Sequence, residues 1–167
     1  MTGDIMDIKV RKFSSNDIKS MIEIWNEVVE EGIAFPQLDI LNEKTGMGFF
    51  SSQSYCGVAV DDNNEILGLY ILHPNNVGRC GHISNASYAV KSTARNMSIG
   101  EKLVKDCMKI GRELGFRILQ FNAVVKSNYQ ARHLYEKLGF KSLGEIPGGF
   151  LMKDGSYEDI VPYFHEL

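Results

Sequence analysis

The chain has 167 residues, a length that suits one domain able to bury a hydrophobic core without disulfides or metals. Apolar residues make up 44% of it, and the formal net charge is −3, which excludes a basic nucleic-acid binder. No apolar run is long enough to span a bilayer, and the amino-terminal stretch lacks the apolar segment of a secretory signal. Three cysteines without a C-x-x-C pair suit reduced thiols. We therefore expect a single cytoplasmic domain over residues 7–167, with no nucleic-acid or membrane partner.

Hydrophobic periodicity and turn residues predict the secondary structure. In chain order the expected elements are a strand in 7–13, a helix in 16–32 capped by Ser14 or Ser15, a short helix within 33–54, a hairpin over 54–74, a strand in 81–90, a helix from 99 to 115 with Ile99, Leu103, Cys107, Ile110 and Leu114 on one face, a strand in 116–125, a helix in 128–140, and one or two closing strands in 141–167.

The segment from 81 to 125 determines the fold class. It reads as strand, helix, strand, and such a crossover requires two parallel strands joined in the right-handed sense. The other strands follow one another through short turns, which favours antiparallel pairing. The sequence therefore predicts a mixed α/β fold: a mostly antiparallel sheet with one parallel pair, flanked by helices.

The turn between 92 and 100 has the features of an anion site. It enters a helix at its amino-terminal end, where unpaired backbone N–H groups and the helix dipole favour negative charge. Arg95 can add a charge-assisted bond, and Gly100 lets an anion approach the backbone. Ser98 followed by Glu101 predicts a capping box with the helix starting near Ile99. The alternative is an ordinary capped helix, since neither a Walker A loop nor a dinucleotide fingerprint is present.

Two ordered motifs resemble those of the GCN5-related N-acetyltransferase (GNAT) superfamily. The first is R-x-x-x-x-G, from Arg95 to Gly100, with Ser98 where that family usually has glycine. The second is N-x-x-A-x-x-L-Y-x-x-L-G-F, from Asn128 to Phe140, which matches throughout. The resemblance implies that the parallel strands splay apart around acetyl-CoA. It places the cofactor against Ala89, Val90, Arg95, Asn96, Met97, Ser98, Ile99, Gly100 and Asn128. Asn128 could equally be a simple helix cap.

Tyr135 is the candidate general acid. It shares a helix face with Ala131, Leu134 and Leu138, so core filling is the alternative. The resemblance implies that its hydroxyl points at the thioester sulfur and protonates the departing thiolate. A positioned acid of this kind contributes roughly 10²–10⁴ in rate.

Asn85 and Asn122 are expected mid-strand on the two parallel strands, as buried amides. Each then needs a partner, because an unsatisfied buried amide costs about 1–3 kcal/mol. They could bond each other or a buried water, or they could serve the reaction. Asn85 stands where many relatives carry a glutamate base, and an amide there can only orient the amine or polarise the acetyl carbonyl. The base is left open among His82, Glu31 through a water, and bulk solvent.

The resemblance implies an acetyl-CoA-dependent N-acetyltransferase that transfers acetyl directly in a ternary complex. Asn85, Asn122 and Asn128 also resemble asparagines of the fungal proline-analogue N-acetyltransferases, so a small amine such as an amino acid or proline analogue is the expected acceptor. The segment around Phe35 and Pro36 could wall the acceptor pocket or close the core. Acetylation of proteins or peptides, and a non-catalytic coenzyme A module, are the alternatives. No metal is expected, because the histidines lack ligand spacing, and a homodimer is left open.

Overall fold

A computed structural model of the protein describes residues 6–167. Its regular elements, in chain order, are β1 (Lys9–Lys12), α1 (Ile18–Glu31), α2 (Glu43–Ser51), β2 (Tyr55–Val60), β3 (Ile66–Pro74), β4 (Ile83–Val90), α3 (Ile99–Glu113), β5 (Ile118–Val125), α4 (Tyr129–Lys137), β6 (Lys141–Ser142), β7 (Ile146–Leu151) and β8 (Tyr157–Glu166). Single 3-10 turns precede α1, β4 and the loop before α3.

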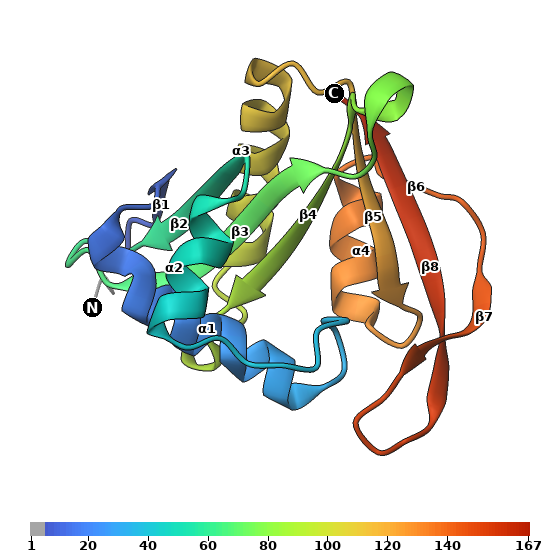
Figure 1. Cartoon of the computed structure of the whole chain (residues 1–167), viewed down its shortest axis with the longest axis horizontal. Coiled ribbons are helices and arrows are strands. Elements are labelled where there is room, and N and C mark those ends of the chain that lie inside the picture. Colours follow the sequence, from blue (N-terminus) through green and yellow to red (C-terminus); the bar gives the residue numbers. More distant parts are fainter. Residues whose placement is uncertain (1–5) are drawn as a thin grey trace, which may run out of the picture.

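One sheet organises the molecule (Figure 1). Its strand order is β1-β2-β3-β4-β5-β8-β6, with β7 paired to β8. All neighbours are antiparallel except β4 and β5, which run parallel because α3 crosses between them. The predicted mixed sheet with one parallel pair is therefore confirmed.

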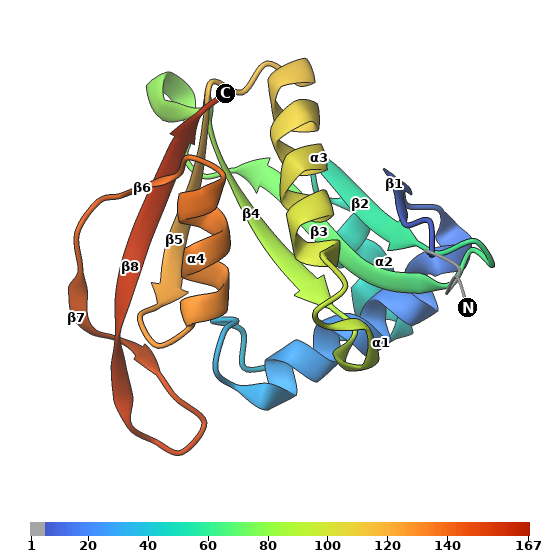
Figure 2. The same cartoon turned by 180° about the vertical axis from the view of Figure 1, so that it is seen from behind.

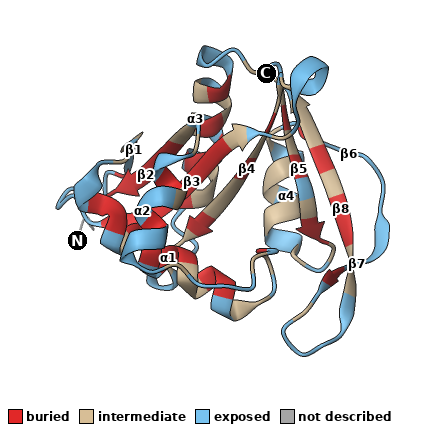
Figure 3. Ribbon diagram, in the orientation of Figure 1, coloured by how far each residue is buried: buried red, intermediate tan, exposed pale blue. Residues whose placement is uncertain are grey.

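Helices cover both faces of this sheet (Figures 1 and 2). On one face α1 and α2 pack over β2, β3 and β4 around the buried Trp25. On the other face α3 and α4 pack over β3, β4, β5 and β8, burying Leu103, Phe121 and Tyr163. Burial follows this arrangement, with buried residues along the strands and along the inner sides of α1, α2 and α3, whereas the inner side of α4 is only partly buried (Figure 3). Within residues 6–167, no helix is both long and apolar enough to cross a lipid bilayer.

The closing part of the chain differs from its prediction. Three strands form there instead of one or two, because a short β6 and the longer β7 each pair with β8. The helix before β5 also ends earlier than expected. Leu114 lies just past α3 and is 50% exposed, so it does not belong to the buried face that Ile99 and Leu103 form.

The β7–β8 hairpin reaches back to the end of α1. The Lys153 backbone N–H donates to the Gly32 carbonyl at 3.1 Å. Its ammonium donates to the Glu30 carbonyl at 2.8 Å, which satisfies one of the last carbonyls of the helix. Gly32 has a φ of 65°, the left-handed conformation that ends α1, as predicted for this helix stop. The hairpin and the first helix thus close one side of the molecule together.

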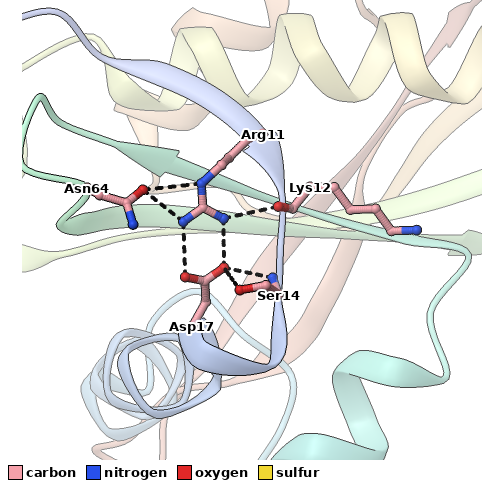
Figure 4. A network of polar contacts seen from close by, with 5 residues as sticks. All are labelled: Arg11, Lys12, Ser14, Asp17 and Asn64. Carbon is pink, nitrogen blue, oxygen red and sulfur yellow. Dashed lines mark hydrogen bonds and ion pairs between the residues drawn. The ribbon is translucent and has the colours of Figure 1, made fainter.

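A polar network ties β1 to α1 and to the β2–β3 turn (Figure 4). The Arg11 guanidinium donates to both oxygens of Asp17, at 2.7 and 3.0 Å, and to the side-chain oxygen of Asn64. Asp17 also accepts the Ser14 backbone N–H at 2.7 Å, at the turn that leads into α1. Only 7% of the Asp17 side chain is exposed, so this bidentate pair is shielded from solvent.

This network makes stability depend on pH. The Arg11 hydrogen bond holds the pKa of Asp17 below its ordinary value, against the opposing effect of burial. A lowered folded-state pKa means that the stabilisation is complete above the unfolded value of about 3.9 and is lost as pH falls through the folded value. We predict that Asp17→Ala lowers the free energy of unfolding by about 2 kcal/mol at pH 7, and that the difference from wild type shrinks below about pH 3.

Urea unfolding of wild type and Asp17→Ala at pH 7 and below about pH 3 measures this difference in the free energy of unfolding. Asp7→Ala is the control, because the Lys9–Asp7 pair at 3.5 Å is well exposed and should contribute less than about 0.5 kcal/mol. An Asp17→Ala loss of equal size at both pH values would contradict the prediction.

Candidate active site

The sheet opens between its two parallel strands. β4 and β5 are paired only at Ile83–Ile118, Ser84–Leu119 and Asn85–Gln120. Beyond Asn85 they diverge, as Figure 1 shows, while β3 stays paired to β4 and β8 to β5. Among the described residues, the β5-facing backbone edge of residues 86–90 therefore has no partner strand. Ala89 and Val90, expected to meet the cofactor, lie on this free edge.

The turn before α3 adopts a left-handed backbone. Ser98 has a φ of 58° and Asn96 a φ of 66°. Ser98 thus takes the conformation for which glycine is usual, and α3 begins at Ile99 as expected. A left-handed residue followed by helical residues turns successive backbone N–H groups toward one side, which is an anion-binding arrangement.

The predicted capping box is wrong. The Ser98 side chain makes no capping bond, because its left-handed backbone directs it away from the helix N–H groups. The Glu101 carboxylate instead forms ion pairs with the ammonium groups of Lys105 and Lys137, each at 2.8 Å. These hydrogen bonds, Lys105 first and Lys137 second, lower the pKa of Glu101 to about 2.

Both neighbouring layers hold this turn. From α1, Glu31 forms an ion pair with Arg95, and the Glu27 carboxylate accepts the Ser92 N–H at 2.6 Å. From α4, the side-chain amide of Gln130 donates to Asn96 at 3.0 Å. The predicted anion turn therefore sits between α1 and α4, with its arginine already paired to a carboxylate.

Gly100 is not required by the packing of the protein. A Cβ added there would lie 3.5 Å from the Leu134 side chain, an ordinary van der Waals distance. Its φ lies outside the left-handed range. A glycine at this place is explained more simply by something that must approach the backbone from outside.

Tyr135 lies on the α3 and α4 side of the opening. Its ring packs 4.4 Å from Phe121 and 5.9 Å from Tyr163, between ring centroids. Burial is the main cause that raises its pKa, so the phenol keeps its proton at neutral pH. Burial and nearby groups act on this hydroxyl, but no described residue forms a hydrogen bond with it, so its proton is available to a ligand.

Asn85 lies on the opposite face, where the strands part. The pairing places His73 of β3 and Gln120 of β5 beside it, in one row across three strands. Alternation along β3 and β4 puts this row on the face that α1 covers farther along, where Leu69 and Ala89 are buried. Sequence reasoning did not single out His73, because no motif contains it.

Asn122 belongs to a chain of amides on the same face. Its amide N–H donates to the Asn75 carbonyl oxygen at 2.6 Å, and its own carbonyl oxygen accepts from Gln120 at 3.1 Å. The side chain is exposed, so the expected buried amide is wrong at this position. Asn85 and Asn122 do not bond one another within the described residues, and Asn75 was missed because it follows β3 in a loop.

Four other residues named from the sequence are Asn128, His82, Phe35 and Pro36. The Asn128 side chain accepts the Ala131 N–H at 3.2 Å, so it caps α4 and keeps its amide N–H groups free. His82 precedes β4 at the paired end of the parallel strands, three residues before the opening. Phe35 is buried 4.4 Å from Trp25, so it closes the core, whereas Pro36 is exposed.

Comparison with known proteins agrees with this geometry. The chain matches the family model described as the acetyltransferase (GNAT) family over residues 18–140. The chain belongs to this family. The expected GNAT fold and acetyltransferase membership are thereby confirmed.

Proteins similar to this GNAT protein come from fungi, archaea and bacteria. N-acetyltransferase aca1 of Schizosaccharomyces pombe is 31% identical over 106 residues, which are 63% of this chain and 51% of the relative. The chain thus spans about half the length of that relative. A GCN5-related N-acetyltransferase from Kribbella flavida is 28% identical, with a TM-score of 0.89 over 96% of this chain and 98% of that chain. A phosphinothricin acetyltransferase from Sinorhizobium meliloti in complex with AcCoA is 21% identical, with a TM-score of 0.89 over 96% and 88%.

The left-handed Ser98 leads to a prediction about stability. A side chain in this conformation costs about 1–2 kcal/mol, part of which glycine recovers despite its greater freedom in the unfolded chain. We predict that Ser98→Gly raises the free energy of unfolding by about 0.5 kcal/mol. Ser92→Gly, in the 3-10 turn of the same loop, should lower it by a similar amount. Paired chemical denaturation curves measure both, and a destabilised Ser98→Gly protein would contradict the left-handed assignment.

Proposed function

We propose that the protein transfers the acetyl group of acetyl-CoA directly to the amine of a small molecule, such as an amino acid or proline analogue. One observation carries this proposal: the opening between β4 and β5 has Tyr135 on one face, an amide-lined face opposite it, and an anion turn beyond the open end of β4, held by both α1 and α4. A donor and an acceptor that enter from opposite faces can meet within it.

The cofactor is the first component of this proposal. The turn from Arg95 to Gly100 would bind the pyrophosphate through backbone N–H groups at the amino-terminal end of α3. The pantetheine arm would add along the free edge of β4 at Ala89 and Val90, where backbone groups lack a partner strand. The S. meliloti neighbour is described in complex with AcCoA, which supports this choice of ligand.

The reaction is a direct displacement at the thioester. The lone pair of a neutral amine attacks the acetyl carbonyl carbon, and a C–N bond forms. The tetrahedral intermediate then collapses, the C–S bond breaks, and the Tyr135 hydroxyl gives its proton to the thiolate. The acylated nitrogen releases its remaining proton to solvent, and solvent returns a proton to Tyr135. Asn85 and Asn122 would orient the amine or polarise the carbonyl oxygen from the acceptor face.

The amine must lose its proton before attack. Glu31 is committed to its ion pair with Arg95, and His82 lies at the closed end of the parallel strands. Neither arrangement favours a base in the opening. We therefore propose that the ammonium loses its proton to solvent on the open acceptor face, where Asn122 is exposed.

A turnover panel tests the function. Purified protein with acetyl-CoA is assayed for free thiol release against L-amino acids, azetidine-2-carboxylate, polyamines and short peptides. Acetylation of a small amine, identified by mass spectrometry, supports the proposal. Turnover confined to peptides would replace it with the protein acetyltransferase alternative, and coenzyme A binding without any turnover would replace it with the non-catalytic one.

Tyr135 yields a specific kinetic prediction. Tyr135→Phe keeps the ring contacts with Phe121 and removes only the proton donor. We predict that kcat falls about 10²-fold, while the acetyl-CoA dissociation constant and the melting temperature stay near wild type. Tyr129→Phe, at the exposed start of the same helix, is the control. Unchanged turnover of Tyr135→Phe with the chemical step limiting would show that another group protonates the thiolate.

Substitution of Gly100 distinguishes an effect on ligand binding from an effect on folding. Gly100→Ala fits the protein and removes a helical glycine, so stability should rise by about 0.5 kcal/mol. The added methyl should nonetheless raise the acetyl-CoA dissociation constant about tenfold, a loss of about 1.4 kcal/mol in binding. Gly48→Ala in α2, where an added Cβ meets nothing, should show the stability gain alone. Calorimetry with equal affinity for both variants would remove the turn from the cofactor site.

A further inference from the structure

The amide of Asn122 is held at both of its ends. Its N–H donates to Asn75 at 2.6 Å, and its carbonyl oxygen accepts from Gln120 at 3.1 Å. An exposed asparagine is ordinarily free to rotate about its broad terminal torsion. Opposite partners at the oxygen and the nitrogen remove that freedom, because turning the amide over would set donor against donor and acceptor against acceptor.

Asn75 reaches Asn122 from the closed end of the parallel strands. Its backbone N–H donates to the Ile83 carbonyl at 2.8 Å, so it is anchored to the start of β4 at the end of β3. Asn122 lies on β5, two residues beyond the last parallel pair at Gln120. The bond between the two side chains therefore links the β3–β4 half of the sheet to β5 on the acceptor face.

The remaining hydrogen-bonding capacity of Asn122 is well defined. An amide side chain has two N–H donors and two acceptor lone pairs. One of each is used by Asn75 and Gln120, so one N–H and one lone pair remain on a fixed group. That lone pair can accept an amine N–H and direct the nitrogen lone pair, while the remaining N–H can meet an oxygen of the acceptor or of the acetyl group.

We propose that Asn75 is a positioning residue for acetyl transfer, acting through its side-chain oxygen on Asn122. The inference rests on the proposed function, since it requires Asn122 to act on the acceptor side. Both side chains lie at the surface, at least partly exposed, so their bond contributes little to folding, and its value lies in orientation.

Matched substitutions test the oxygen specifically. Asn75→Leu keeps the approximate volume and removes the acceptor, and Asn75→Asp keeps an acceptor for the Asn122 N–H. Asn76→Leu and Asn76→Asp are the controls, because the Asn76 side chain bonds only the neighbouring Val77 N–H at 2.8 Å. Each variant is assayed with the best amine of the turnover panel, with melting temperature and the KM for acetyl-CoA measured alongside.

We expect Asn75→Leu to lower kcat/KM for the amine about tenfold, with the KM for acetyl-CoA and the melting temperature unchanged. Asn75→Asp should stay within about threefold of wild type, and both Asn76 controls should match wild type. In an Asn122→Ala background, Asn75→Leu should add no further loss, because the group that it positions is gone.

Other results would overturn the inference in distinct ways. Wild-type turnover in Asn75→Leu removes any role for Asn75, and equal losses in the Leu and Asp variants show that the side-chain oxygen is not what matters. A lowered melting temperature that accounts for the loss makes the role structural. Additive losses in the double variant make Asn75 act independently of Asn122. A wild-type protein that acetylates no small amine would instead end the proposed function itself.

Discussion

The short pairing between β4 and β5 is the constraint on which the site depends. Only three residue pairs join these parallel strands, and each strand continues beyond them with its other neighbour still paired. A backbone edge inside a sheet normally has its hydrogen bonds satisfied by the adjacent strand. Here residues 86–90 expose that edge in the middle of the protein, so the fold itself provides a place where an extended ligand completes the sheet.

Two separate hydrophobic clusters, one on each face of the sheet, stabilise the protein despite this opening. The Trp25 cluster fixes α1 against β3 and β4, while the cluster around Leu103 and Phe121 contains residues of α3, of α4 and of strands on both sides of the gap. Because this second cluster continues across the divergence, the two halves of the sheet stay together with only a short stretch of pairing between them. Within the cluster α3 packs against β1 to β4, and it begins at the anion turn, so it orients that turn beside the gap.

The sequence predicted the parts of the site that depend on regular periodicity. The second motif placed Tyr135 on the partly buried face of α4 because helical spacing determines its neighbours, and strand alternation placed Asn85 on the face that it occupies in the structure. The capping role predicted for Ser98 is wrong because its backbone conformation is set by a turn that α1 and α4 hold. The predicted role of Glu101 in the same cap is wrong because its carboxylate pairs with Lys137, which lies far along the chain. Asn75 carries no local signal at all, since its partner Asn122 lies 47 residues farther along the chain and only the folded structure brings the two together.

The position of β8 has a consequence for synthesis of the protein. The last strand of the chain lies between β5 and β6, and its hairpin is fastened to the end of α1 through Lys153. Until β8 leaves the ribosome, β5 has only its brief contact with β4 and an exposed outer edge, a surface prone to wrong pairing. The region of β5 and β8 is thus the last part of the described structure to be completed, and the turn before α3 is synthesised well before it.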